Sequence, residues 1–205
     1  MNKKILLLLI SLLLGSIAIQ AQQSKYGFRL GLNYSDIDFD DNSSGIFGGD
    51  KDARIGFAAG FFATYFLSEK FSIQPEIQYS SQGEKTQVLN KESVNVAANN
   101  PRSFDRLNYG VLQVPILFNY HITNNLHISV GPQAGILIWE WERAGNYEIF
   151  QFSGIGGIGY YFTDNLGVDL RASYGLTDVI KTNSTSTFDA TGVNHYLQLT
   201  LSYRL

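Results

Sequence analysis

The feature that most constrains this chain is a strict alternation of side chains that begins after a short polar turn. After Thr163-Asp164-Asn165, apolar residues occupy every second position, and small or charged residues fall between them. The apolar set is Leu166, Val168, Leu170, Ala172 and Tyr174, and the other set is Gly167, Asp169, Arg171, Ser173 and Gly175. Because alternate residues of a strand lie on opposite faces, this segment predicts a strand with one apolar face and one small or charged face. Such a strand is typical of a transmembrane β-barrel.

The same turn and alternation occur twice earlier, around Ser68 and around Thr123. The order is the same each time: an apolar residue, a Ser or Thr, two further polar residues and an apolar residue. A strand of period two follows. We therefore predict three hairpins with short polar turns.

Taken over the whole chain, the alternation predicts eight strands. They cover residues 26–35, 54–67, 71–82, 107–120, 126–139, 150–162, 166–174 and 193–205. Three short turns alternate with four longer polar connections, which suits a barrel with short periplasmic turns and longer external loops. An open sheet would leave backbone groups unpaired in lipid, so the barrel must close. The predicted fold class is all-β: an eight-stranded antiparallel up-and-down transmembrane β-barrel with short periplasmic turns and longer extracellular loops.

Some positions interrupt the alternation. Phe62 and Phe66 fall on the polar face of the second strand, so its register stays open. Pro75 lacks a backbone N–H and predicts a bulge in the third strand. In the fourth strand, Leu107, Tyr109 and Val111 have the opposite parity to the apolar residues after them, which predicts a second bulge.

Residues 1–21 predict a secretory signal peptide, and residues 22–205 the outer-membrane β-barrel domain. Lys3 and Lys4 precede an apolar run over residues 5–14, and Ala21 is a small residue at the expected cleavage site. That run is shorter than the ~20 residues that a membrane-spanning helix needs. We expect export and location in the outer membrane of a Gram-negative bacterium.

The net charge argues against a nucleic-acid-binding protein, and the cysteine content excludes a disulfide-stabilised one. The leader holds two of the 15 basic residues and no acid, so the remaining chain has 13 basic against 18 acidic residues. This acidic balance argues against a nucleic-acid partner. The chain has no cysteine, so closure and burial must stabilise it in place of disulfides.

Parity assigns the charged residues to the barrel interior. We predict a lumen polar network of Arg29, Glu76, Asp169, Arg171 and Arg204. Further inward-facing residues are Gln74, Gln78, Gln113, Gln133 and His127. An eight-stranded barrel is only wide enough for side chains to fill it, and unpaired buried charges are very costly. We therefore interpret the network as ion pairs that plug the lumen, and a gate or narrow polar path as the alternative.

Aromatic residues near the strand ends predict an interfacial girdle. Its members are Tyr26, Tyr34, Trp139, Trp141, Tyr160, Phe162, Tyr174 and Tyr203. Trp and Tyr favour the boundary between lipid and water, so these positions suit a membrane protein.

The sequence offers little support for catalysis or metal binding. His127 and Ser129 resemble the His and Ser of lipid A deacylases, but that motif continues with Asn where this chain has Val130. By parity both residues face the lumen, and no acid that would orient the histidine is evident nearby. His121 and His195 form no ligand cluster, and the acidic segment 36–41 lacks a twelve-residue calcium loop. We expect no enzymatic activity, no cofactor and no bound metal.

Four segments resemble the PorT-like outer-membrane barrels, which are similar to the small OmpA and OmpX type of barrel in the porin family. They are Leu112-Gln113-Val114-Pro115, Gly131-Pro132-Gln133, the glycine-rich segment 154–159, and residues 170–176. The resemblance covers nearly all of the chain after residue 21. It implies location and architecture but no single activity.

These observations favour an integral outer-membrane barrel that acts as a structural or interaction scaffold. It would present external loops and keep its narrow lumen plugged. Expected partners are the bilayer and outer-membrane lipids, with surface or secretion-apparatus proteins as candidates at the loops, and we expect a monomer. The alternative function is a narrow porin or a transporter of small or apolar solutes. A third interpretation is a soluble lipocalin-like binder with its apolar faces inside, since parity alone does not say which face is the interior.

Overall fold

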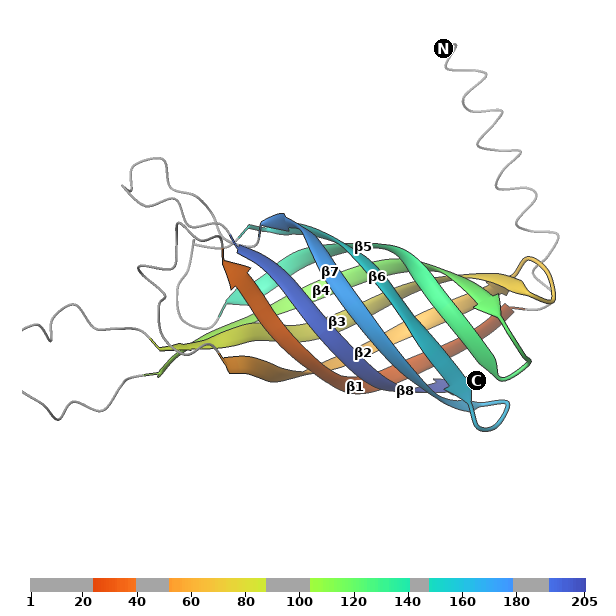
Figure 1. Cartoon of the computed structure of the whole chain (residues 1–205). Coiled ribbons are helices and arrows are strands. Elements are labelled where there is room, and N and C mark those ends of the chain that lie inside the picture. The colour runs from red at the N-terminus through yellow and green to blue at the C-terminus, as the bar shows by residue number, and fades with distance from the viewer. Residues whose placement is uncertain (1–23, 40–51, 88–103, 141–147, 179–191) are drawn as a thin grey trace, which may run out of the picture.

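The computed structural model is a single closed antiparallel β-barrel (Figure 1). It describes residues 24–39, 52–87, 104–140, 148–178 and 192–205. The strands are β1 (Ser24–Phe39), β2 (Asp52–Phe66), β3 (Phe71–Gln87), β4 (Phe104–His121), β5 (Leu126–Glu140), β6 (Phe150–Tyr161), β7 (Leu166–Asp178) and β8 (Gly192–Arg204). Each strand pairs with its neighbours in the chain, and β1 pairs with β8 to close the ring. The predicted fold class is confirmed.

The described residues contain no helix of the length and apolar character needed to span a membrane. The signal peptide predicted over residues 1–21 lies outside the described residues.

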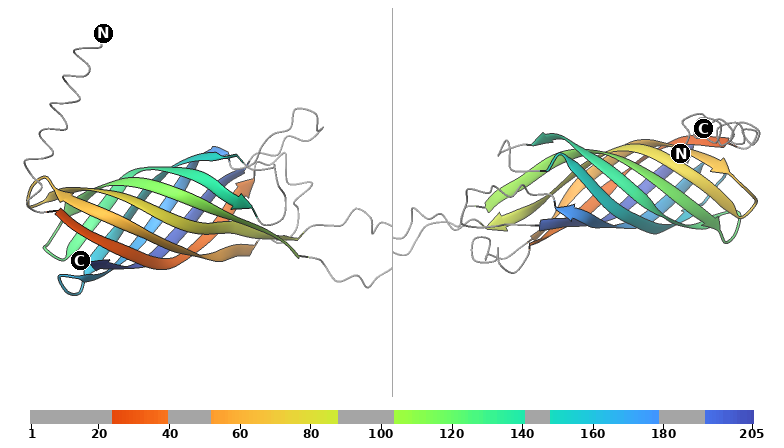
Figure 2. Two further views of the ribbon diagram at one scale, coloured as in Figure 1. Left: turned by 180° about the vertical axis from the view of Figure 1, so that it is seen from behind. Right: turned by 90° about the horizontal axis from the view of Figure 1, so that it is seen from above.

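Three four-residue turns lie at one end of the barrel, which we call the turn end (Figure 2). The other end, where the longer connections begin, is the loop end. In every turn the recurring hydroxyl accepts two backbone hydrogen bonds. Thr163 Oγ1, for example, accepts from the N–H of Asn165 at 3.3 Å and of Leu166 at 3.0 Å. Ser68 and Thr123 do the same in their turns, which explains why a Ser or Thr recurs at this position.

The alternation places apolar side chains on the outside of the barrel. Leu170 is 50% exposed and Leu199 is 54% exposed, whereas Asp169 and Arg171 are each 1% exposed. The interior is therefore the charged face. An apolar interior of the lipocalin type does not describe this chain.

The bulge predicted at Pro75 is wrong. Pro75 pairs with Ile116 of β4, and the β4 register is the same on both sides of it. On the β2 side, the ladder skips two positions and resumes in the same register from Tyr65. The missing N–H is thus accommodated without an inserted residue.

The bulge predicted in the fourth strand also needs correction. Val111 pairs with Leu137, but Gly110 pairs with Trp139, so the extra residue is Ile138 of β5. β4 keeps its parity through this region. Tyr109 and Val111 are fully buried on the lumen side, where they are apolar fillers. Phe62 is another inward apolar residue, and it is 3% exposed.

Candidate functional site: the barrel lumen

Four charged residues meet at one level of the lumen, and we call them the charge cluster. They are Arg29 on β1, Glu76 on β3, and Asp169 and Arg171 on β7. In a closed ring of eight strands, β3 and β7 are four strands apart and stand on opposite walls. Arg171 donates from Nη1 to Glu76 Oε2 at 3.0 Å and from Nη2 to Oε1 at 3.1 Å. This bidentate ion pair therefore spans the lumen.

The other ion-pair contacts bring each arginine of the cluster close to both carboxylates. Arg29 Nη1 lies 3.3 Å from Glu76 Oε1, and its Nη2 lies 3.8 Å from Asp169 Oδ2. Arg171 Nη2 is also 3.5 Å from Asp169 Oδ1. With two guanidinium groups and two carboxylates, the cluster has no net charge.

Neutral neighbours hold the two carboxylates in place. Gln74 Nε2 donates to Glu76 Oε1 at 2.7 Å, and the Ser202 hydroxyl donates to Asp169 Oδ2 at 3.1 Å. The guanidinium of Arg29 lies over the ring of Phe62, 5.0 Å from its centroid. These contacts offset part of the cost of keeping charges in a dry interior. The guanidinium nitrogens of Arg29 lie at ion-pair distances from the two carboxylates, but no described hydrogen bond reaches them.

His127 joins the charge cluster through an acid that sequence reasoning did not find. Its Nε2 lies 3.3 Å from Asp169 Oδ1, although β5 and β7 are separated by β6. The residue between them in the ladder is Gly159, which pairs with His127 on one side and with Asp169 on the other. A Cβ at Gly159 would lie 2.3 Å from His127 Cε1 and 2.6 Å from Asp169 Oδ1. The glycine thus gives the two side chains room to meet.

Ser129 does not form a catalytic pair with His127 in the described part of the chain. It is buried in the lumen two residues further along β5, and no described hydrogen bond joins the two side chains. His127 is instead occupied by Asp169 and stacks on Tyr161, with 5.8 Å between the ring centroids.

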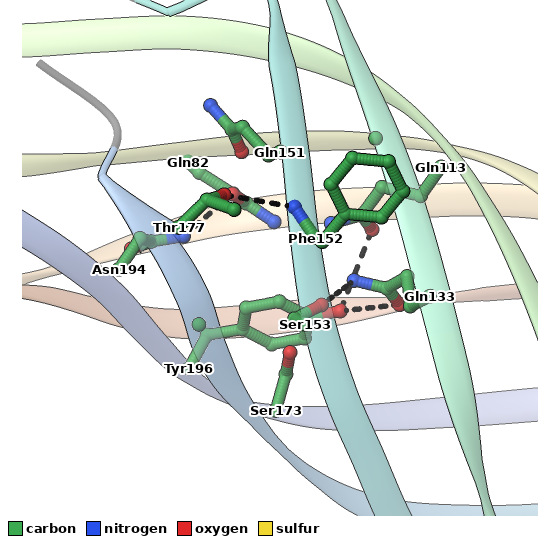
Figure 3. Close-up of a pocket in the computed structure, with 12 residues that line it drawn as sticks. Gln82, Gln113, Gln133, Gln151, Phe152, Ser153, Ser173, Thr177, Asn194 and Tyr196 are labelled. Carbon is green, nitrogen blue, oxygen red and sulfur yellow. Dashed lines mark hydrogen bonds between the residues drawn. The ribbon is translucent and has the colours of Figure 1, made fainter.

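Toward the loop end, the lumen is filled by amides and hydroxyls, which we call the amide layer (Figure 3). Tyr196 donates its hydroxyl to Gln133 Oε1 at 2.9 Å, and Asn194 Nδ2 donates to Gln82 Oε1 at 2.7 Å. Both bonds join β8 to strands across the barrel. The cavity in this layer has a volume of about 20 Å³. That is room for about one water molecule and not for a solute.

At the turn end, the lumen opens into a cavity of about 800 Å³, which we call the mouth. Its lining includes Lys25, Phe66, Glu69, His121, Asn124 and Arg204. The structure places Arg204 here, apart from the other four residues of the predicted network. Its guanidinium carbon lies 3.3 Å from the ring centroid of Tyr161.

The predicted girdle residues fall near both ends of the barrel. Tyr26, Tyr160, Phe162 and Tyr203 are exposed toward the turn end, and Tyr34 and Tyr174 toward the loop end. Trp139 is half-buried, and its indole Nε1 lies 2.3 Å from where a Cβ on Gly110 would be. The bulge at Ile138 shifts the parity of β5, so Trp139 lies on the outer wall with Gly110. Trp141 lies outside the described residues.

Within the described ranges, no group of three or more His, Asp or Glu side chains is placed to hold a metal ion. Asp40 and Asp41 of the acidic segment lie outside those ranges.

Comparison with known proteins identifies the architecture. Residues 20–181 match the family profile of the outer membrane protein beta-barrel domain. No curated protein matches the sequence.

Two solved structures are similar over their whole length. Ail, the attachment invasion locus protein of Yersinia pestis, shares 14% identity, with 90% of this chain and 100% of Ail covered and a TM-score of 0.50. Neisserial surface protein A shares 10% identity, with the same coverage and a TM-score of 0.52. At these identities, the likeness establishes the fold alone.

Proposed function

Because this chain belongs to the outer membrane protein beta-barrel family, we propose that it is an outer-membrane scaffold whose closed barrel anchors external loops and whose lumen does not conduct. Family membership places it in the outer membrane of a Gram-negative bacterium, in contact with lipid. The scaffold role and the closed lumen are the proposed part.

The observation that carries the proposal is the bidentate pair of Arg171 and Glu76 across the barrel. Both side chains are fully buried, with donor–acceptor distances of 3.0 and 3.1 Å. Opening a path past them would leave a buried charge without its partner, which costs about 3–5 kcal/mol. The amide layer adds a second barrier, since its cavity of about 20 Å³ is too small for a hydrated ion.

Recordings in a planar bilayer test the closed lumen. We expect purified protein to give no steady openings over a range of voltages. The double variant Glu76→Ala/Arg171→Ala removes both halves of the bridge and keeps Arg29 opposite Asp169, so it serves as the matched comparison. Steady openings by the unaltered protein would overturn the proposal.

The scaffold role rests on the loop end. The name of Ail links that protein to attachment. For this chain, we propose a division between a rigid barrel and external contact segments. Surface proteins, surface polymers or a secretion apparatus are the proposed partners, and we propose a monomer with no catalytic role. Membership of the PorT-like branch is also a proposal, supported by the segments around Gln113, Gln133 and Tyr174.

An epitope inserted between β3 and β4 tests the orientation of the barrel. We expect antibody to label intact cells that carry this insertion. The control epitope belongs in the turn after Ser68, where labelling should require permeabilised cells. The reverse pattern would contradict the proposed loop function.

A narrow transporter is the second candidate function, and the wide mouth at the turn end favours it. A cavity of about 800 Å³ opens at that end. On this alternative, the cluster rearranges to admit a solute. Swelling of protein-containing liposomes in small sugars or amino acids would support transport, and absence of swelling would support the scaffold.

A further inference from the structure

Arg204 is a buried cation at the mouth without an acidic partner among the described residues. The residue is 6% exposed, and its Nε has no hydrogen-bond acceptor within that part of the chain. Tyr161 covers one face of its guanidinium, and no described carboxylate lies within ion-pair distance of it. A guanidinium presents five N–H donors around its edge, so stacking on a ring leaves its hydrogen-bonding capacity unused.

The side chains that share the mouth with Arg204 make it a cationic cavity with an apolar wall. Lys25 lies at an inward position of β1, with its Nζ 6.0 Å from the ring centroid of Phe66. Phe66 stacks on His121, with 5.2 Å between the ring centroids, and Asn124 contributes an amide. Glu69 on the turn is the acid of this lining.

The acids deeper in the barrel do not neutralise Arg204. Glu76 and Asp169 are already shared between Arg29 and Arg171, and the charge cluster is neutral by itself. In the ladder with β1, Arg204 pairs with Gly27 and Ser202 with Arg29, so Arg204 lies nearer the turn end than the cluster does.

From these contacts we propose that the mouth at the turn end is a binding site for an organic oxyanion, a phosphate or carboxylate attached to an apolar group. The edge of the Arg204 guanidinium and the Lys25 ammonium bind the oxyanion, and Asn124 donates to it. The apolar part of the ligand packs against Phe66. A volume of about 800 Å³ is in the range of small-molecule sites. The site is separate from the charge cluster and does not depend on whether the lumen conducts.

Two sources bring this chemistry to the turn end: a soluble organic anion, or the head group of an anionic phospholipid from the surrounding leaflet. Both present phosphate or carboxylate oxygens to the same donors. The proposed site binds the phosphate or carboxylate that both ligands share, and the nanodisc experiment below distinguishes the two sources.

Titration with phenyl phosphate tests the site. The barrel is prepared in nonionic detergent without anionic lipid, and the ¹⁵N–¹H resonance of Arg204 Nε is followed together with the heat of binding. We expect saturable binding that shifts the Arg204 resonance. Arg204→Gln should weaken binding about tenfold or more, because a charge-assisted hydrogen bond is lost. Arg204→Lys should recover part of the affinity, since the positive charge remains.

Lys70→Gln is the matched control. Lys70 is exposed on the same turn end but does not line the mouth, so its removal should leave the affinity unchanged. Should Arg204→Gln fail to fold, Lys25→Gln carries the test because Lys25 is exposed, and it should weaken binding several-fold. Equal affinity in the unaltered protein and in either mouth variant would overturn the proposal, as would the absence of saturable binding.

Nanodiscs separate the two sources. If a lipid head group occupies the mouth, phosphatidylglycerol in the disc should weaken phenyl phosphate binding relative to phosphatidylcholine alone. If the ligand is soluble, the two discs should give the same affinity. In both cases, the Arg204→Gln barrel must bind phenyl phosphate more weakly than the unaltered one.

Discussion

Replacing Glu76 with Gln should destabilise the barrel more than its change in size suggests. Glu76 is 4% exposed, and its carboxylate lies 3.0 Å from one guanidinium and 3.3 Å from the other. Glu76→Gln keeps the shape of the side chain but leaves Arg29 and Arg171 facing Asp169 alone, so the neutral cluster becomes a buried +1 charge. Breaking a buried ion pair on one side costs about 3–5 kcal/mol, and we expect a loss of this size in the free energy of unfolding.

Urea unfolding of the barrel in lipid vesicles measures this loss, with tryptophan fluorescence and heat-modifiable gel migration as two independent signals. The double variant Glu76→Gln/Arg171→Gln restores neutrality, because Arg29 and Asp169 remain as a pair. Its loss should therefore be smaller than the sum of the two single losses by at least about 1 kcal/mol.

The control is Glu69→Gln, which removes an exposed acid from the turn after β2. Its effect should stay within about 0.5 kcal/mol. If Glu76→Gln costs no more than this control, then the cluster does not stabilise the barrel and the argument from buried charge is wrong.

Three further changes test other parts of the account in the same unfolding assay. Gly159→Ala should cost about 1–3 kcal/mol because its Cβ would displace His127 from Asp169, whereas Gly154→Ala, with nothing within 4 Å of its Cβ, should be nearly neutral. Thr163→Ala should cost about 0.5–1.5 kcal/mol per hydrogen bond lost in the turn, and Thr163→Ser should recover it; equal stability of the two variants would contradict the role of the hydroxyl. Leu199→Arg should cost up to about 2–4 kcal/mol in vesicles if Leu199 lies near the middle of the bilayer, and no cost at all would contradict its contact with lipid.

The strands and their faces were predictable because each depends on local sequence. The side chains of a strand alternate with period two. Each short turn contains a Ser or Thr whose hydroxyl accepts backbone hydrogen bonds within the turn. Once the turns were placed, parity assigned the charged residues to the interior face, and Arg29, Glu76, Asp169 and Arg171 are buried in the structure.

The contacts between inward residues were not predictable, because they depend on the register of strands far apart in the sequence. Glu76 and Arg171 are 95 residues apart and meet only because β3 and β7 stand on opposite walls. Parity gave Arg204 the same face, and the structure places it at the mouth, away from the other four charged residues. The pair of His127 and Asp169 depends on the absence of a side chain at Gly159, which alternation alone does not reveal.

Of the two bulge predictions, the one at Pro75 is wrong, and the one in the fourth strand has the right level but the wrong strand, since the extra residue is Ile138 of β5. Both assumed that an inward apolar residue or a proline must interrupt a strand. Val111 and Phe62 show that a narrow lumen also takes apolar fillers, and the ladder passes Pro75 without an extra residue.

The outward face of each strand contacts lipid and the inward face does not, and a lipid-borne spin probe tests this orientation without any substitution. Ile116 is 43% exposed on the outer wall of β4, whereas its neighbour Leu117 is fully buried in the lumen. In vesicles that contain a doxyl-labelled stearic acid, the methyl resonances of Ile116, Leu199 and Leu201 should broaden, and those of Leu117 and Val111 should stay sharp. Broadening of Leu117 and Val111 with sharp signals from Ile116 and Leu199 would contradict the orientation of the whole barrel.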